Sequence, residues 1–285
     1  MSLHSPRSRY LPLLGHEIHV MEWGDPAHPP VICWHGLART GRDFDELAER
    51  LAKTHFVLCP DTIGRGLSSW SHDPQADYRL SHYADIARAM MDLYGLRGTR
   101  WIGTSMGGQI GITVAAQTPG RIAALVVNDI GPDVPAPALD RIVTYSSELP
   151  TFDTVAGAER WLREVYAPFG PADDPFWTRM TETSVRRRDD GSLTIHYDPR
   201  LIEVFDATRE TVDLRDLWAR VTAPTLVLRG ADSDLLTDDL AAEMAATGPK
   251  PDIEVFEGCG HAPNLSLPAD WTRLAPLLRP LGFET

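Results

Sequence analysis

The sequence predicts an α/β fold in which a doubly wound, mostly parallel sheet is interrupted by one helical insertion. Three observations indicate it. Short apolar runs alternate with helix-like stretches as far as about Pro132 and again from about residue 221. The segment between them, 133–220, is rich in prolines and aromatic residues and shows helical stripes but no run typical of a buried strand. A glycine-flanked serine, Ser105, stands where an apolar run passes into a helix-like run.

The individual elements follow from the spacing of apolar residues. Weak alternation over 17–23 predicts an edge strand or one arm of a hairpin. Apolar runs predict further strands over 30–34, 56–59, 99–102, 123–128, 224–228 and 253–256, the first two buried on both faces. Helical spacing predicts helices over 44–51, 83–96, 109–117, 158–165 and 237–246, with Ser81 as N-cap of the second. We therefore expect a core domain made of 1–132 and 221–285, and a helical cap, 133–220, packed over the sheet.

Composition limits the possible partners. The formal net charge of −13 argues against nucleic acid or an anionic membrane surface, and no apolar run approaches membrane-spanning length. The three cysteines are odd in number, and two lie in apolar runs, which indicates small buried side chains and no disulfide framework. Residues 1–15 lack the pattern of a signal peptide. We expect a soluble, cytoplasmic protein that acts on a small molecule; no pattern indicates an oligomeric state.

The segment around Ser105 matches the pattern G-x-S-x-G. A serine on a sharp turn between a strand and a helix takes a strained backbone conformation, so the positions two before and two after it must lack bulk. Gly103 and Gly107 meet that need. Such a turn exposes the Ser105 hydroxyl above the sheet and directs the Met106 N–H to the same point, at the positive end of the following helix. Ser105 is the predicted nucleophile.

A nucleophilic serine needs a base, an acid that orients the base, and donors for an oxyanion. His261 follows the last predicted strand in a loop with two glycines, which can bring its imidazole to the top of the sheet. Three carboxylates remain open as the acid. Asp232 and Asp234 lie in the loop after the strand 224–228, and Asp129 follows the strand after the serine.

The loop after the strand 30–34 is expected to complete the oxyanion hole. Leu37, next after His35-Gly36, is positioned to give the second backbone N–H beside that of Met106. We interpret His35 as a structural residue that fixes this loop. Asp61 and Ser68 are interpreted as turn residues whose side chains bond to backbone.

Five segments together resemble a known family. They are Cys33-Trp34-His35-Gly36-Leu37, Pro60-Asp61 with 64–68, Gly103-Thr104-Ser105-Met106-Gly107-Gly108, 127–132 and Gly260-His261-Ala262-Pro263. The chain resembles the α/β-hydrolase superfamily, in particular single-domain esterase and lipase-like members with a helical cap after the sixth strand. The resemblance covers nearly all of the chain outside the cap and implies a serine hydrolase without metal or organic cofactor. One position departs from the family pattern: the acid usually lies three residues after the strand-ending glycine, and here Ser233 stands there.

Among the three carboxylates, we predict Asp234 as the acid. Asp232 precedes Ser233 and suits a turn in which its carboxylate bonds to nearby backbone. Asp234 is followed by Leu235 and Leu236, so it can lie over apolar surface and meet the imidazole as a buried carboxylate. Similar relatives favour a Ser-Asp-aliphatic run at this point, which supports the choice by resemblance only.

The predicted function is hydrolysis of carboxylic esters through an acyl-enzyme on Ser105, because alcohol leaving groups need the least further help. Lactone hydrolysis, hydrolysis of a C–C bond beside a ketone, and cofactor-free peroxidation use the same residues and stay open. Dehalogenation and epoxide opening are disfavoured, since those relatives carry aspartate where Ser105 stands. A ligand-binding receptor on a hydrolase scaffold is the alternative from another class. In the cap, aromatic residues between Trp161 and Trp177 are expected to line an apolar pocket.

Overall fold

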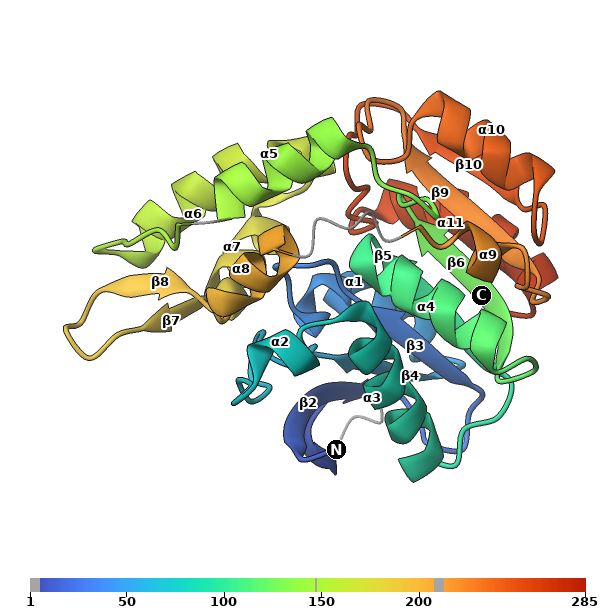
Figure 1. The fold of residues 1–285 in the computed structure, drawn as a ribbon, viewed down its shortest axis with the longest axis horizontal. Helices are drawn as coiled ribbons and strands as arrows, with labels where there is room; N and C mark the ends of the chain where they lie inside the picture. The colour runs from blue at the N-terminus through green and yellow to red at the C-terminus, as the bar shows by residue number, and fades with distance from the viewer. Residues whose placement is uncertain (1–5, 147, 208–212) are drawn as a thin grey trace.

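The computed structural model describes residues 6–285, apart from 147 and 208–212. One sheet of eight strands, in the order β1-β2-β4-β3-β5-β6-β9-β10, forms its centre (Figure 1). The strands are β1 (Arg7–Leu13), β2 (His16–Trp23), β3 (Pro30–Trp34), β4 (Phe56–Pro60), β5 (Thr99–Thr104), β6 (Ile122–Asn128), β9 (Thr225–Gly230) and β10 (Asp252–Phe256). β1, β2 and β4 pair antiparallel, and the other pairs are parallel. The predicted fold class is confirmed.

Helices cover both faces of the sheet, as doubly wound sheets require. The apolar cluster on one face includes side chains of α3 (Leu80–Leu93), α4 (Met106–Gln117), α9 (Arg215–Trp218) and α10 (Asp238–Ala246). The cluster on the other face includes side chains of α1 (Asp45–Leu51), which follows the short helix η1 (Gly41–Phe44), and of α11 (Pro268–Leu278), which precedes η3 (Arg279–Leu281). Along β3, Ile32 and Trp34 belong to the first cluster, and Val31 and Cys33 belong to the second. The sheet core is therefore apolar on both sides.

Most predicted strands and helices occur within two or three residues of their expected positions. Ser81 is an exception: α3 begins at Leu80, after Arg79, so Ser81 lies inside the helix and is not its N-cap. The stretch 17–23 forms β2, which is one arm of a hairpin and not an edge strand, since it lies between β1 and β4. The edge strand is β1, which gives no apolar pattern because most of its side chains are exposed. The cysteines are free and buried, as expected.

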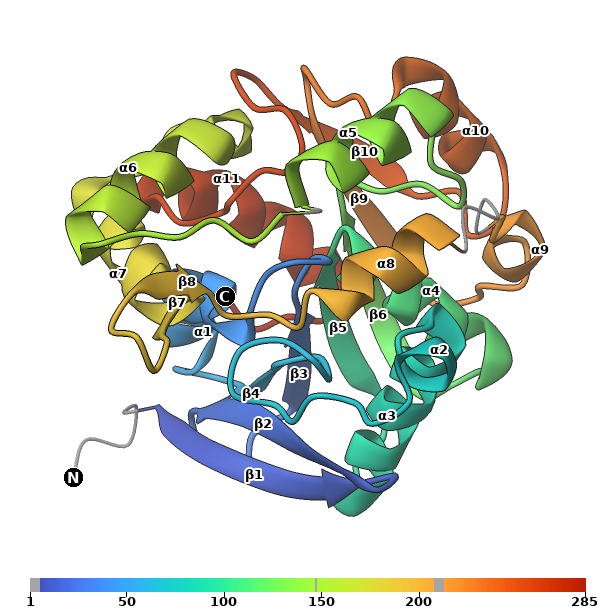
Figure 2. The same ribbon diagram turned by 60° about the vertical axis from the view of Figure 1, so that its left-hand side comes forward.

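The segment between β6 and β9 holds α5 (Ala136–Ser146), α6 (Val155–Val165), η2 (Ala167–Phe169), α7 (Asp174–Ser184) and α8 (Arg200–Ala207). Helices α5 to α8 group on one side of the sheet, next to the N-terminal end of α4 (Figures 1 and 2). We call 133–220 the insertion. It is not purely helical: β7 (Val185–Arg187) and β8 (Leu193–Ile195) form an antiparallel hairpin, and β8 is buried. The strand is too short for an apolar run to reveal it.

Two buried contacts join the insertion to the core. The last helix of the insertion, α9, packs on the core through Trp218, whose indole N–H donates to Thr247 after α10. A second junction lies between Tyr78, in the loop after the short helix α2 (Pro74–Asp77), and Asp198 before α8, where the phenol donates to the buried carboxylate at 2.6 Å. Among the described residues, no helix is both long and apolar enough to cross a membrane.

Candidate active site

Ser105 lies at the turn between β5 and α4, in a conformation that side chains seldom adopt. Its φ of 53° and ψ of −122° are left-handed, and it forms the N-cap of α4. A Cβ added to Gly103 would lie 2.2 Å from the Gly107 carbonyl oxygen, and one added to Gly107 would lie 2.0 Å from the Trp34 oxygen. The two flanking glycines are therefore required by the close approach of backbone at the turn.

His261 joins Ser105 to a buried carboxylate. Its Nε2 lies 2.9 Å from the Ser105 Oγ, and its Nδ1 lies 2.9 Å from Oδ2 of Asp129. With Nδ1–H donating to the carboxylate, Nε2 is left to accept from the serine hydroxyl. Asp129 follows β6 directly, has a φ of 59°, and has no exposed surface. The three side chains form the order nucleophile, base and acid that acyl transfer requires.

The prediction that Asp234 meets His261 is wrong. Its side chain is 46% exposed, and both carboxylate oxygens accept from Arg141 of α5, at 2.6 and 2.8 Å. Asp232 is also exposed. Asp234 points outward because Ser233, its neighbour, points inward: Ser233 Oγ donates to Asp129 Oδ2 at 2.6 Å. Ser233, at the position where the family pattern has its acid, therefore hydrogen-bonds to the carboxylate that contacts His261.

The Asp129 carboxylate is held by three donors. Besides His261 and Ser233, the Gly230 N–H donates to Oδ1 at 2.8 Å. A buried charge is tolerated when its oxygens are satisfied in this way. The three hydrogen bonds therefore fix the Asp129 carboxylate in position beside the imidazole.

Leu37 and Met106, the predicted donors of an oxyanion hole, both lie near Ser105: Met106 follows it directly, and Leu37 lines the same two cavities, which are described below. Met106 is the first residue of α4, whose first N–H groups have no partner within the helix, and no hydrogen bond from the Leu37 N–H is found among the described residues. Arg65, which the sequence analysis named only as part of the segment 64–68, contacts both residues. Its Nε donates to the Leu37 carbonyl at 2.8 Å, and its Nη2 lies 3.8 Å from the Met106 sulfur. A fully buried arginine leaves no periodic signal in the sequence.

His35 has the structural role that the sequence suggested. Its Nε2 accepts from the Thr62 N–H at 2.9 Å and its Nδ1 donates to the Gly36 carbonyl, so it ties the loop after β3 to the loop after β4. Complete burial lowers its pKa to about 4, against smaller opposing effects of Asp61 and the Gly36 carbonyl. His35 is therefore neutral near pH 7.

Asp61 and Ser68 also bond to backbone, as expected. Asp61 accepts from the Gly41 and Leu67 N–H groups, and Ser68 Oγ donates to the Asp61 carbonyl. Burial favours a higher pKa for the Asp61 carboxyl, but the hydrogen bond and charge of His19 hold that pKa below its usual value.

His19 creates a second Ser–His–Asp row. Its Nδ1 lies 2.8 Å from Asp61 Oδ2 and its Nε2 lies 2.6 Å from Ser8 Oγ. Ser8 stands within the exposed edge strand β1 and lines neither of the two cavities described below. Ser8 lies within a strand and not at a strained turn before a helix, which is where Ser105 lies.

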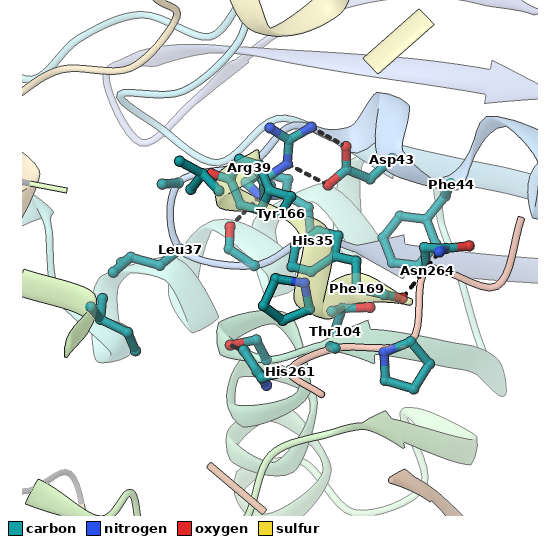
Figure 3. A pocket seen from close by; sticks show the side chains of 18 of the residues that line it. His35, Leu37, Arg39, Asp43, Phe44, Thr104, Tyr166, Phe169, His261 and Asn264 are labelled. Atoms are coloured by element: carbon teal, nitrogen blue, oxygen red, sulfur yellow. Dashed lines mark hydrogen bonds and ion pairs between the residues drawn. The ribbon is translucent and has the colours of Figure 1, made fainter. Parts of the chain in front are cut away.

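Two cavities meet at Ser105, and both are lined by Leu37 and Ile142 as well. Cavity A, of about 880 Å³, reaches His261 and the Arg39–Asp43 pair (Figure 3). Cavity B, of about 1070 Å³, extends the other way, to Tyr78 and Phe205.

The aromatic residues predicted to line a pocket, those between Trp161 and Trp177, do not all do so. Tyr166, Phe169 and Phe176 line cavity A, as predicted. Trp161 packs instead against Phe152, with ring centroids 5.7 Å apart, and does not line either cavity. Of these, only the residues that line cavity A are placed to touch a ligand.

Comparison with known proteins agrees with this architecture. The sequence model of the α/β hydrolase fold matches residues 29–266. The chain belongs to the α/β-hydrolase family. It is 36% identical over 264 residues to the 3-hydroxybutyrate-oligomer hydrolase of Cupriavidus necator, which covers 89% of this chain and 90% of that protein.

Two solved structures show the same fold over nearly the whole chain. An α/β hydrolase from Novosphingobium aromaticivorans is 35% identical with a TM-score of 0.86, covering 98% of this chain and 99% of that one. A putative hydrolase from Rickettsia typhi is 28% identical with a TM-score of 0.89, covering 97% and 99%. The family resemblance noted in the sequence is confirmed, and the curated relatives support a hydrolase.

Proposed function

We propose that the protein is a serine hydrolase that cleaves carboxylic esters through an acyl-enzyme. The observation that carries this proposal is the unbroken row Ser105–His261–Asp129, with both contacts at 2.9 Å, at the junction of two cavities. Leu37 and Met106 act as the oxyanion hole.

In the first step, His261 Nε2 takes the proton of Ser105 Oγ while the oxygen attacks the ester carbonyl carbon. The resulting oxyanion accepts from the Leu37 and Met106 N–H groups. The tetrahedral intermediate collapses, the C–O bond to the alcohol breaks, and the imidazolium gives its proton to the leaving alkoxide. Water, deprotonated by the same imidazole, then attacks the acyl carbon and releases Ser105 with the acid. Asp129 keeps the imidazole in the required tautomer throughout.

Linear esters of hydroxy acids are the substrate class that we propose. A nucleophile between two cavities suits an ester with an extended group on each side of the carbonyl, one arm in each cavity. The relative named as a 3-hydroxybutyrate-oligomer hydrolase supports this class. In cavity A, Arg39 is buried and bonds to Asp43 through Nε and Nη2, and its Nη1 has no hydrogen-bond partner among the described residues. That donor suits a carboxylate or hydroxyl end of such an oligomer.

The test is turnover and covalent labelling. Native protein should release acid from short-chain p-nitrophenyl esters and from 3-hydroxybutyrate dimers and trimers, and Ser105→Ala should lose nearly all turnover at unchanged melting temperature. A fluorophosphonate should attach to Ser105, as read by peptide mass spectrometry. Ser8→Ala is the matched control, because it removes the serine of the other Ser–His–Asp row, and it should keep full turnover and labelling.

Two results would contradict the proposal. One is label on another serine together with full activity of Ser105→Ala. The other is negligible turnover of every ester and lactone offered, combined with a ligand-dependent rise in melting temperature, which is the behaviour of a receptor.

A further inference from the structure

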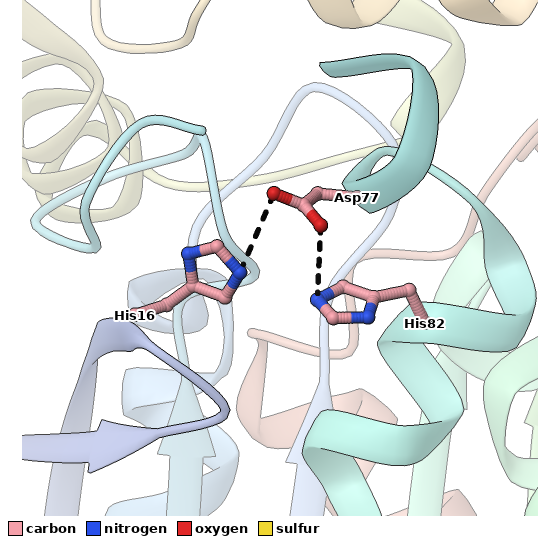
Figure 4. Close-up of side chains that lie close together, drawn as sticks. All are labelled: His16, Asp77 and His82. Atoms are coloured by element: carbon pink, nitrogen blue, oxygen red, sulfur yellow. Dashed lines mark ion pairs between the residues drawn. The ribbon is translucent and has the colours of Figure 1, made fainter. Parts of the chain in front are cut away.

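Two histidines and a carboxylate converge on one point away from Ser105. His16 lies at the start of β2, Asp77 in α2 and His82 in α3, and both rings face the carboxylate (Figure 4). Their ligand atoms all lie within 4.8 Å of one another. Each carboxylate oxygen faces one ring: Oδ2 lies 3.4 Å from His16 Nε2, and Oδ1 lies 3.7 Å from His82 Nε2.

These separations fit ligands of a shared ion better than direct contacts. A nitrogen–oxygen hydrogen bond is about 2.7–3.2 Å long, so both distances are too great for good bonds. In a tetrahedral zinc site with metal–ligand distances of about 2.0–2.1 Å, neighbouring ligand atoms lie about 3.4 Å apart. His82 Nε2 is also buried without a hydrogen-bond partner among the described residues, although it faces the carboxylate. An imidazole nitrogen that faces a carboxylate without a hydrogen bond is available as a metal ligand.

The surroundings orient this trio. Ser71 Oγ donates to Asp77 Oδ2 at 2.6 Å, which fixes the carboxylate as outer-shell partners do in metal sites. The two imidazole rings meet edge to face, with centroids 5.4 Å apart. The side chains of His16, Asp77 and His82 are 12%, 17% and 20% exposed, so the trio lies close to the surface.

We propose that His16, Asp77 and His82 bind a divalent transition-metal ion of the kind that prefers imidazole, such as Zn²⁺, Co²⁺ or Ni²⁺. Nε2 of each histidine and one or both oxygens of Asp77 are the protein ligands, and water completes the coordination. The ion joins the β1–β2 hairpin to α2 and α3. Tyr78, Ser81 and Tyr83, which adjoin the ligands in sequence, line cavity B, so the ion fixes one wall of that cavity. The site is separate from the proposed ester chemistry and does not depend on it.

Calorimetry with Zn²⁺ and absorption spectroscopy with Co²⁺, on full-length protein without a histidine tag, test the proposal. We expect one Zn²⁺ per chain and visible Co²⁺ bands of four- or five-coordinate character. At a free Zn²⁺ concentration 100 times the Kd, the melting temperature should rise by about 4 °C. His16→Ala, His82→Ala and Asp77→Asn should each weaken binding at least tenfold, with folding checked by circular dichroism.

Two control variants locate the ion. His28→Ala removes a histidine outside the trio, and His261→Ala removes the base of the active site; both should bind Zn²⁺ as native protein does. Loss of binding in His261→Ala with retention in His82→Ala would place the ion at Ser105 and overturn the proposal. Absence of Zn²⁺ and Co²⁺ binding to native protein would overturn it as well.

Discussion

At the scale of single residues, Asp129 decides how the site is built. Its carboxylate is fully buried and accepts from a backbone N–H, a serine hydroxyl and an imidazole at once. Hydrogen bonds to a charged group in such surroundings are worth more than those between neutral groups, and the loss of the acceptor leaves donors unpaired. The position of one carboxylate therefore governs both the tautomer of His261 and the packing of the loop after β9.

Asp129→Asn is expected to lose on the order of 10⁴ in kcat, because an amide N–H facing Nδ1 forces the imidazole into the wrong tautomer. Asp234→Asn is the matched control. It removes only an exposed pair with Arg141, so its kcat should stay within about tenfold of native, roughly 1.4 kcal/mol of barrier. Steady-state turnover of a p-nitrophenyl ester measures both. A collapse of Asp234→Asn with an active Asp129→Asn would reverse the assignment.

A substitution at Ser233 should restore part of the activity that Asp129→Asn loses. Its hydroxyl lies 2.6 Å from the oxygen that contacts His261, so a carboxylate at 233 can reach the imidazole. Asp129→Asn combined with Ser233→Asp should therefore regain at least tenfold over Asp129→Asn alone. If the double variant turns over no faster than Asp129→Asn, a carboxylate at position 233 cannot replace the one at position 129.

At the scale of elements, the insertion both lines part of cavity A and has a small apolar core of its own. Phe169, in η2 between α6 and α7, lines cavity A, whereas Trp161 of α6 packs on Phe152 near the β7–β8 hairpin. The same stretch of chain thus supplies side chains that touch a ligand and side chains that hold the element together. Position along the stretch does not separate the two kinds.

Phe169→Ala should change substrate preference more than stability, because it empties part of cavity A. We expect a several-fold fall in kcat/KM for esters with an extended group, little change for acetate esters, and a small shift in melting temperature. Trp161→Ala should show the reverse, with about 1–3 kcal/mol less free energy of unfolding, since Trp161 is half-buried, and unchanged chain-length preference. Equal loss of stability in both variants, with preference unchanged, would show that Phe169 only fills space.

The elements that could be predicted are those with a local signal. The turn at Ser105 depends on glycines two residues away, and the buried strands depend on continuous apolar runs. Both can therefore be predicted from the sequence alone. The contact between Asp129 and His261 joins residues 132 apart, and three loop aspartates look alike in sequence. The one available sign was Ser233 in the usual acid position, after strand β9, whose neighbour β6 is followed directly by Asp129. Exposed β1 and the short β7–β8 hairpin left no pattern to detect.

At the scale of the whole molecule, buried side chains tie loops from different strands into one site. Arg65 and His35 link the loops after β3 and β4, and the Tyr78–Asp198 contact links α2 to the insertion. His35 makes this arrangement sensitive to acid. Its folded pKa is about 4, and its usual value in an unfolded chain is about 6.5.

As the pH falls below about 6.5, the unfolded chain binds a proton on His35 that the folded chain does not bind until about pH 4. Folding therefore loses stability in that window, by about 2 kcal/mol between pH 7 and pH 4.5 from this one group. Urea unfolding at pH 7 and pH 4.5 should show this loss of stability in native protein. In His35→Gln the loss should be about 2 kcal/mol smaller. His28→Gln should behave as native. An identical pH dependence in His35→Gln would assign the loss to other groups.

The placement of Asp129 also affects how such proteins are classified. Ser105 and Asp129 follow neighbouring strands, and the Ser105 N–H bonds to the Asn128 carbonyl, so the two keep their spacing without help from a long loop. An alignment that requires a carboxylate at the position of Ser233 would place this chain among family members without a complete set of catalytic residues. A search that also considers the residue directly after β6 would keep this chain among the hydrolases, together with any relative that has its carboxylate at the same place.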